Sequence, residues 1–107
     1  MNNKRNKSVW VNNVPTYSES HTRDQNEIVE LVWKAIKGDS GAFSKLYIIY
    51  IEPIYRYIFY QVKDKTTAED ITQEAFFKAW NSLHSCKGRE RTFPSWLYQI
   101  AHTFLPR

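Results

Sequence analysis

The segment from Thr66 to Trp80 constrains the fold most, because its apolar residues recur with the period of an α-helix. At about 100° per residue these side chains share one side, which is predicted to be buried. Thr66 or Thr67 can cap this helix, and Glu69 and Asp70 would lie in its first turn, where carboxylates suit the helix dipole. The helix should end near Leu83. The residues expected on its buried side are Ala68, Ile71, Ala75, Phe76, Ala79 and Leu83.

The opposite side of this helix combines acidic and aromatic character. Two interpretations stay open. The first is a salt-bridged surface with a single exposed aromatic residue, which is common in proteins. The second is a docking strip for a partner, since a purely solvated face would rarely include a phenylalanine. The residues on this side are Asp70, Gln73, Glu74, Phe77 and Asn81.

A shorter helix is predicted from about Asn26 to Lys37. Asp24 or Asn26 can cap it, and Gly38 follows its end. Residues 1–25 ahead of it are polar and without a period, so we expect a flexible tail and a helical domain over residues 26–107. The apolar positions of this helix are Ile28, Leu31, Val32, Ala35 and Ile36.

The next predicted helix follows a cap at Asp39 or Ser40. Pro53 lies within its apolar stripe and lacks a backbone donor, so we expect a kink or short break between Tyr50 and Pro53. The helix should resume to about Val62, ahead of a polar turn at residues 63–65. Its stripe consists of Phe43, Leu46, Tyr47, Tyr50, Ile54, Tyr57 and Ile58.

The last predicted helix opens at Pro94 and is ended by Pro106, after a basic loop at residues 85–93. With only three glycines and four prolines in the chain, these segments predict an all-α domain of three to four helices. On the last helix the buried side is expected to hold Trp96, Leu97, Ile100, Ala101 and Phe104, and the outer side Tyr98, Gln99 and His102.

Composition narrows the class of function. The 107 residues suffice for one domain, and a net charge of +4 is compatible with nucleic acid without being diagnostic of it. A single cysteine, Cys86, permits no intrachain disulfide, which fits a reducing cytoplasm. No apolar run is long enough to span a membrane, and the amino terminus does not resemble a secretory signal.

No catalytic constellation is visible in the sequence. The three histidines lie far apart and lack further ligands at metal spacing. Asp70 and Glu74 are four residues apart beside Lys78, with no histidine near them, and no glycine-rich phosphate loop occurs. We therefore expect a helical interaction module, with neither catalysis nor a metal or other cofactor.

Three blocks of the sequence together resemble one known family. They extend from Ala68 to Trp80, from Gly38 to Tyr47 and from Trp96 to Ala101. Their order and spacing are similar to those of region 2 of bacterial sigma factors of the extracytoplasmic-function group. The resemblance covers roughly residues 28–101 and implies a compact, all-α region 2 domain.

The resemblance also implies partners and site residues. In this family the signature helix binds the clamp helices of the largest RNA polymerase subunit, and the loop and last helix engage the melted −10 element of the promoter. Basic side chains would hold phosphates there, and aromatic ones would stack on unpaired bases. The polymerase-binding positions would be Asp70, Gln73, Glu74 and Phe77, and the DNA-binding positions Lys87, Arg89, Arg91, Trp96, Tyr98, Gln99 and His102. Trp96 also falls on the side expected to be buried, so a core role is the simpler interpretation for it.

The sequence departs from the family pattern in its last helix. Gln99 and His102 stand where the family usually has basic residues, and Thr103 where it has asparagine. No second, −35-binding domain follows, so we expect a truncated product, a split factor that needs a separate region 4 subunit, or an isolated domain. Alone, such a chain should bind promoter DNA weakly and in a salt-sensitive way.

Two other functional classes stay open on the sequence. One is a module that binds polymerase or an anti-sigma protein without reading DNA, and the weakened basic face favours it. The other is an unrelated small helical DNA-binding domain, although no helix-turn-helix spacing supports it.

Overall fold

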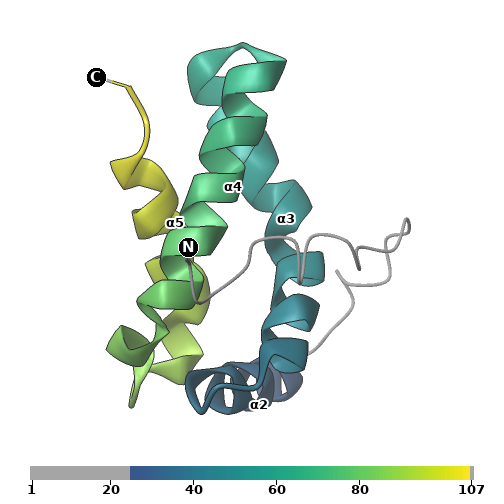
Figure 1. Cartoon of the computed structure of the whole chain (residues 1–107), viewed down its shortest axis with the longest axis vertical. Helices are drawn as coiled ribbons and strands as arrows, with labels where there is room; N and C mark the ends of the chain where they lie inside the picture. The colour runs from purple at the N-terminus through teal and green to yellow at the C-terminus, as the bar shows by residue number, and fades with distance from the viewer. Residues whose placement is uncertain (1–24, 107) are drawn as a thin grey trace, which may run out of the picture.

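The computed structural model describes residues 25–106, and helices account for nearly all of them (Figure 1). The predicted all-α class is confirmed, and no strand occurs between Gln25 and Pro106. The tail predicted for residues 1–25 lies outside the described residues except for Gln25, which begins the first described helix, so the tail stays a prediction. The α-helices are α2 (Gln25–Ile36), α3 (Ser40–Val62), α4 (Lys65–Asn81) and α5 (Phe93–Thr103), and the 3-10 turns are η2 (Leu83–Cys86) and η3 (Glu90–Thr92).

The helices form a small bundle around α4. In Figure 1, α3 and α4 lie side by side along the long axis, α5 lies beside α4, and α2 crosses the lower end. The packing agrees with this view, since α4 contacts both α3 and α5, and α2 contacts α3 and the two 3-10 turns. None of the described helices is both long and apolar enough to cross a membrane.

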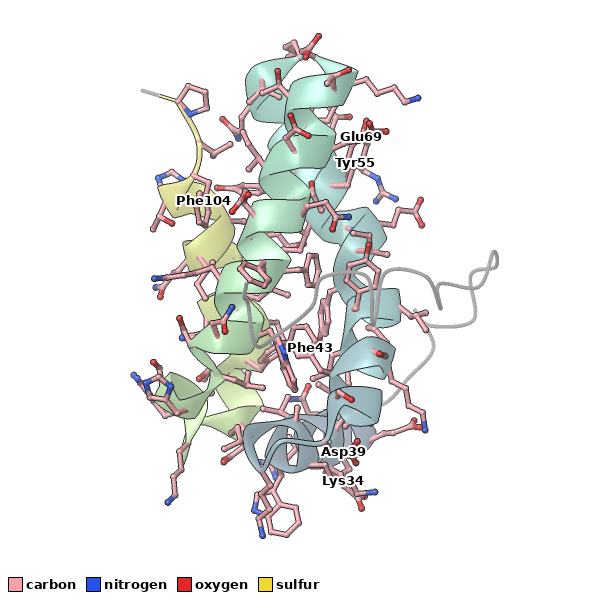
Figure 2. The ribbon with its side chains drawn as sticks, viewed as in Figure 1. Lys34, Asp39, Phe43, Tyr55, Glu69 and Phe104 are labelled. Carbon is pink, nitrogen blue, oxygen red and sulfur yellow. The ribbon has the colours of Figure 1, made fainter. Side chains whose placement is uncertain are left out.

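Aromatic pairs connect α3 to the two helices that follow it. Figure 2 shows Phe43 pointing into the space between α3 and α4, where it is fully buried. Ring pairs at such distances stabilise a fold by about 0.5–1.5 kcal/mol beyond the burial of their surface. The pairs are Phe43 with Trp80 (ring centroids 4.9 Å apart), Tyr47 with Phe76 (4.9 Å) and Tyr50 with Phe93 (5.7 Å).

The buried side of α4 agrees with the predicted stripe and is wider than it. Five of the six predicted residues are buried and Ile71 is partly buried, but Thr72 and Trp80 are buried as well. Thr72 is accommodated because its hydroxyl donates to the Ala68 carbonyl at 2.7 Å, which satisfies a polar group in the core. The extra width follows from the two neighbours of α4, one on each side.

The cap predicted for α4 was wrong. Asp64, rather than Thr66 or Thr67, is the N-cap: its carboxylate accepts from the Thr67 backbone N–H at 2.8 Å and from the Thr67 hydroxyl at 2.7 Å. These bonds lower the pKa of the Asp64 carboxyl. The helix therefore begins two or three residues earlier than expected, at Lys65, and Glu69 and Asp70 lie beyond its first turn.

Of the kink or short break predicted in α3, the break was wrong, since the helix runs through Pro53 without interruption, and the kink stays a prediction. Proline removes one backbone donor, but tertiary packing can outweigh that loss. Ile49 and Ile54, on either side of this point, are both buried. The two halves of α3 are therefore held in one helix by the core.

The ends of α3 follow ordinary capping chemistry. Asp39 is the N-cap, as predicted, and accepts from the Ala42 N–H at 3.1 Å. Gly38 has a φ of 104°, which suits the chain reversal after α2. At the other end Lys63 has a φ of 60° and donates its N–H to the Phe59 carbonyl at 2.7 Å. The left-handed backbone conformation is unfavourable for a lysine, so Lys63 adopts it at a cost in conformational energy.

The segment predicted as a plain loop at residues 85–93 contains η3 and part of η2. Pro94 lies in the first turn of α5, as expected. The helix ends at Thr103, before Pro106, because Phe104 and Leu105 donate to the carbonyls of Ala101 and His102 in a turn.

Candidate nucleic-acid and protein interfaces

The four residues predicted to bind polymerase lie on one side of α4. Asp70 and Glu74 are exposed, while Gln73 and Phe77 are partly buried. Helical spacing places them in a continuous row, because positions three, four and seven apart are neighbours on a helix. We call these four residues the α4 strip. Its carboxylates and aromatic ring lie outside the core, as the sequence predicted.

Gln73 joins the α4 strip to a hollow that the sequence did not reveal. Its side-chain amide donates to the Tyr47 hydroxyl at 3.2 Å. Burial raises the pKa of the Tyr47 phenol, and the bond from Gln73 opposes that shift. The hollow, called here the α3–α4 groove, has a volume of about 640 Å³ and is lined by Tyr47, Ile51, Glu52, Tyr55, Lys65, Glu69, Thr72 and Gln73.

The rim of the α3–α4 groove is charged. Figure 2 shows Tyr55 and Glu69 on the same flank of the molecule, from α3 and α4 respectively. Lys65 lies 3.8 Å from Glu69, and Glu52 receives a 2.8 Å hydrogen bond from Arg56. Such exposed pairs contribute little to stability, at most about 1 kcal/mol each. An apolar floor with a charged rim suits another protein surface better than a nucleic acid.

The predicted basic residues of the loop are exposed and lie near the C-terminal end of α4. Lys87, Arg89 and Arg91 all lie between Cys86 and α5. Arg89 is partly committed, since its guanidinium donates to the Ser85 carbonyl at 3.2 Å. The loop is further ordered by Glu90, whose carboxylate accepts from the Gly88 N–H at 3.0 Å.

Trp96 lies between the two roles considered for it. The side chain is partly buried and packs on the core, with its ring 5.7 Å from that of Phe93. It also lines a small hollow of about 180 Å³ beside the loop. The core interpretation is therefore incomplete. The members of this loop hollow are Cys86, Arg89, Thr92, Ser95, Trp96 and Gln99.

Tyr98 differs from its prediction, because it is partly buried rather than fully outward. Its ring meets that of Tyr57, from α3, at a centroid distance of 5.3 Å and an interplanar angle of 82°. Burial raises the pKa of the Tyr98 phenol, with Arg56 opposing the shift. A hollow of about 440 Å³, called here the tyrosine hollow, is lined by Tyr57, Tyr98, Gln99, His102 and Thr103.

His102 is exposed, as predicted, and is bound to α3. Its Nδ1 atom lies 3.0 Å from the Tyr57 hydroxyl. Gln99 is also exposed and lines both the loop hollow and the tyrosine hollow. The two hollows are therefore neighbours along one side of α5.

Cys86 is buried, and burial raises the pKa of its thiol to about 11, with Arg89 opposing the shift. Such a thiol is a poor nucleophile at neutral pH. Within residues 25–106, no group of three His, Cys, Asp or Glu side chains is placed to hold a metal ion.

Sequence reasoning missed the contributions of α3 to these surfaces. Ile51 and Tyr55 line the α3–α4 groove, while Tyr57, which was expected in the buried stripe, lines the tyrosine hollow. Ile51 and Tyr55 are four residues apart, so they form a second apolar row outside the predicted stripe, and this signal was present in the sequence.

Comparison with known proteins identifies relatives of the chain. The family model described as sigma-70 region 2 matches residues 46–104. The chain is 39% identical over 82 residues to the ECF RNA polymerase sigma factor BldN of Streptomyces coelicolor, an alignment that covers 77% of this chain and 31% of the relative. It is 41% identical over 59 residues to the ECF RNA polymerase sigma factor SigX of Bacillus subtilis, covering 55% of this chain and 30% of the relative.

A third relative is the RNA polymerase sigma-H factor of Pseudomonas aeruginosa, at 38% identity over 80 residues, which covers 75% of this chain and 40% of the relative. The chain thus spans about a third of the length of these curated relatives. No solved structure is significantly similar to it.

Proposed function

Because the chain belongs to the sigma-70 region 2 family, we propose that it acts as the region 2 part of a sigma factor in transcription initiation. In this role it binds RNA polymerase core and engages the melted −10 element of a promoter. This family is not a class of enzymes. The cytoplasm is the compartment of this activity, since polymerase and promoter meet there.

The observation that carries the proposal is the position of two different surfaces on one small bundle. The α4 strip is acidic and aromatic and borders the α3–α4 groove, which favours a protein partner. The family resemblance implies that the partner is the pair of clamp helices of the largest polymerase subunit. These helices can pack one face against the α4 strip and the adjoining groove. Phe77 is the expected anchor, because an aromatic residue at the centre of an interface often contributes about 2 kcal/mol or more.

The surface of the loop and α5 supports contact with single-stranded DNA. Lys87, Arg89 and Arg91 supply positive charge, and Trp96 and Tyr98 supply partly exposed rings. Cations neutralise phosphates and release counterions, while rings stack on unpaired bases. Gln99 and His102 complete the surface with side chains that can form hydrogen bonds.

The test of the protein surface is binding to immobilised RNA polymerase core. Phe77→Ala should weaken the affinity about 30-fold, the equivalent of 2 kcal/mol. Trp33→Ala is the matched control, since Trp33 is 50% exposed on α2, away from the α4 strip, and its loss should leave binding unchanged. Equal affinities for the wild-type chain and Phe77→Ala, with both folded, would remove the α4 strip from the interface.

A second candidate is the interaction module that binds polymerase or an anti-sigma protein without reading DNA. The neutral side chain of Gln99, at the centre of the α5 surface, favours it. The two candidates separate on single-stranded DNA carrying a −10 element, in the presence of core polymerase. If the chain binds polymerase but does not increase the affinity of polymerase for that strand, the second candidate is supported.

A further inference from the structure

The tyrosine hollow has the shape of a corner between two helices. Tyr57 comes from α3 and Tyr98 from α5, and their rings are nearly perpendicular, at 82°. A flat molecule that enters such a corner can stack its face on one ring while its edge meets the other. The volume of about 440 Å³ leaves room for one heteroaromatic base together with water.

Polar side chains border the tyrosine hollow. Gln99 carries both a donor and an acceptor on one amide, the pattern that pairs with the edge of a nucleobase. The Tyr57 hydroxyl and His102 Nδ1 lie 3.0 Å apart, so this bond fixes the imidazole beside the hollow. The lining of the hollow itself is almost wholly apolar, so it favours stacking of a base on its rings over hydrogen bonds inside it.

We propose that the tyrosine hollow holds one unstacked base of single-stranded DNA, and that Tyr57 on α3 is a base-stacking residue. This inference rests on the proposed function and adds to it a site built partly by α3. Gln99 connects the tyrosine hollow to the loop hollow, because it lines both of them. A strand held by the basic loop would therefore run along α5 and place a later base between Tyr57 and Tyr98.

The charge near the tyrosine hollow is compatible with this path. Arg56 is close enough to influence the Tyr98 phenol, and Glu52, 2.8 Å from Arg56, offsets part of its charge. The main phosphate contacts would then come from the loop, and the tyrosine hollow would contribute chiefly by stacking. Loss of the ring should matter here more than loss of a charge.

The test compares two tyrosines of one helix. Tyr57→Ala should weaken binding of a short fluorescein-labelled oligo(dT) at low salt about 5- to 150-fold, as measured by fluorescence anisotropy. Tyr60→Ala is the matched control: Tyr60 lies one turn away on α3 and is 67% exposed, and it lines none of the hollows described above. Tyr57→Phe should keep most of the affinity, because it retains the ring.

A second measurement does not depend on how well the variants fold. The same oligonucleotide carrying 5-iodouracil is irradiated with the wild-type chain, and the crosslinked residue is identified by mass spectrometry. A crosslink at Tyr57 supports the inference, whereas a crosslink at Tyr98 alone is expected from the proposed function already. Binding by the wild-type chain with crosslinks confined to other residues, and equal affinity of Tyr57→Ala, would overturn this inference alone. Absence of any strand binding by the wild-type chain, both alone and with core polymerase, would overturn the DNA-binding part of the proposed function as well.

Discussion

Neighbouring phenylalanines on α4 offer a sharp test of where the core ends. Phe76 is 1% exposed, and its ring meets that of Tyr47 at a centroid distance of 4.9 Å. Phe77, the next residue, is only partly buried and belongs to the α4 strip. The same substitution at the two positions should therefore have different consequences for stability.

The magnitudes follow from burial. Phe76→Ala should lower the free energy of unfolding by about 3–5 kcal/mol, the usual cost of truncating a fully buried phenylalanine. Phe77→Ala should cost about 1 kcal/mol, because only part of its surface leaves water on folding. A domain of this size has a total stability of about 5–15 kcal/mol, so the first variant is severely weakened and the second stays folded.

The assay is urea unfolding followed by far-ultraviolet circular dichroism. With an m-value of about 1 kcal/mol/M, the midpoint of Phe76→Ala should fall by about 3 M or more while m stays constant. Phe76→Leu keeps most of the volume and should lose less than about 1.5 kcal/mol. Equal losses for Phe76→Ala and Phe77→Ala would refute the reasoning, because Phe77 would then be a core residue and the α4 strip would be misassigned.

Four further outcomes are expected. The Cys86 thiol should react slowly with iodoacetamide at pH 8 and much faster in urea, because its pKa is raised to about 11 in the folded chain; equal rates would contradict its burial. Lys63→Gly should raise stability by about 0.5–1 kcal/mol in urea unfolding, because glycine tolerates the φ of 60°. Asp39→Ala should lose about 1 kcal/mol in the same assay and Asp39→Asn less, since asparagine keeps a cap acceptor. Lys87→Ala and Arg91→Ala should each reduce the slope of log affinity for oligo(dT) against log salt by about 0.7, and an unchanged slope would exclude a phosphate contact.

Helix positions and most of the core could be predicted from the sequence, because periodicity reports which side of a helix meets the rest of the fold. Trp80 was missed because α4 has neighbours on two sides, and a single stripe describes only one of them. The α4 cap was misplaced because several residues near it have capping side chains. The left-handed turn at Lys63 decides in favour of Asp64, and that conformation is not visible in the sequence.

The candidate sites were predictable only where they lie within one segment. The α4 strip and the basic residues of the loop each lie within one short segment, and the structure leaves them exposed or partly buried; their binding roles stay predictions. The α3–α4 groove and the tyrosine hollow each combine residues from two helices. Their shapes depend on how α3 packs, which the spacing of residues along one helix does not specify.

Tyr55 and Tyr57 lie two residues apart on α3, so this one helix connects the α3–α4 groove to the tyrosine hollow. Tyr55 faces the groove next to α4, and Tyr57 faces the hollow next to α5. Residues two positions apart in an α-helix are separated by only about 3 Å along the axis and by about 200° around it. The rings of Tyr55 and Tyr57 therefore point in nearly opposite directions. A protein bound on one flank and a DNA base on the other would thus be held at a fixed distance and angle, with no joint between them.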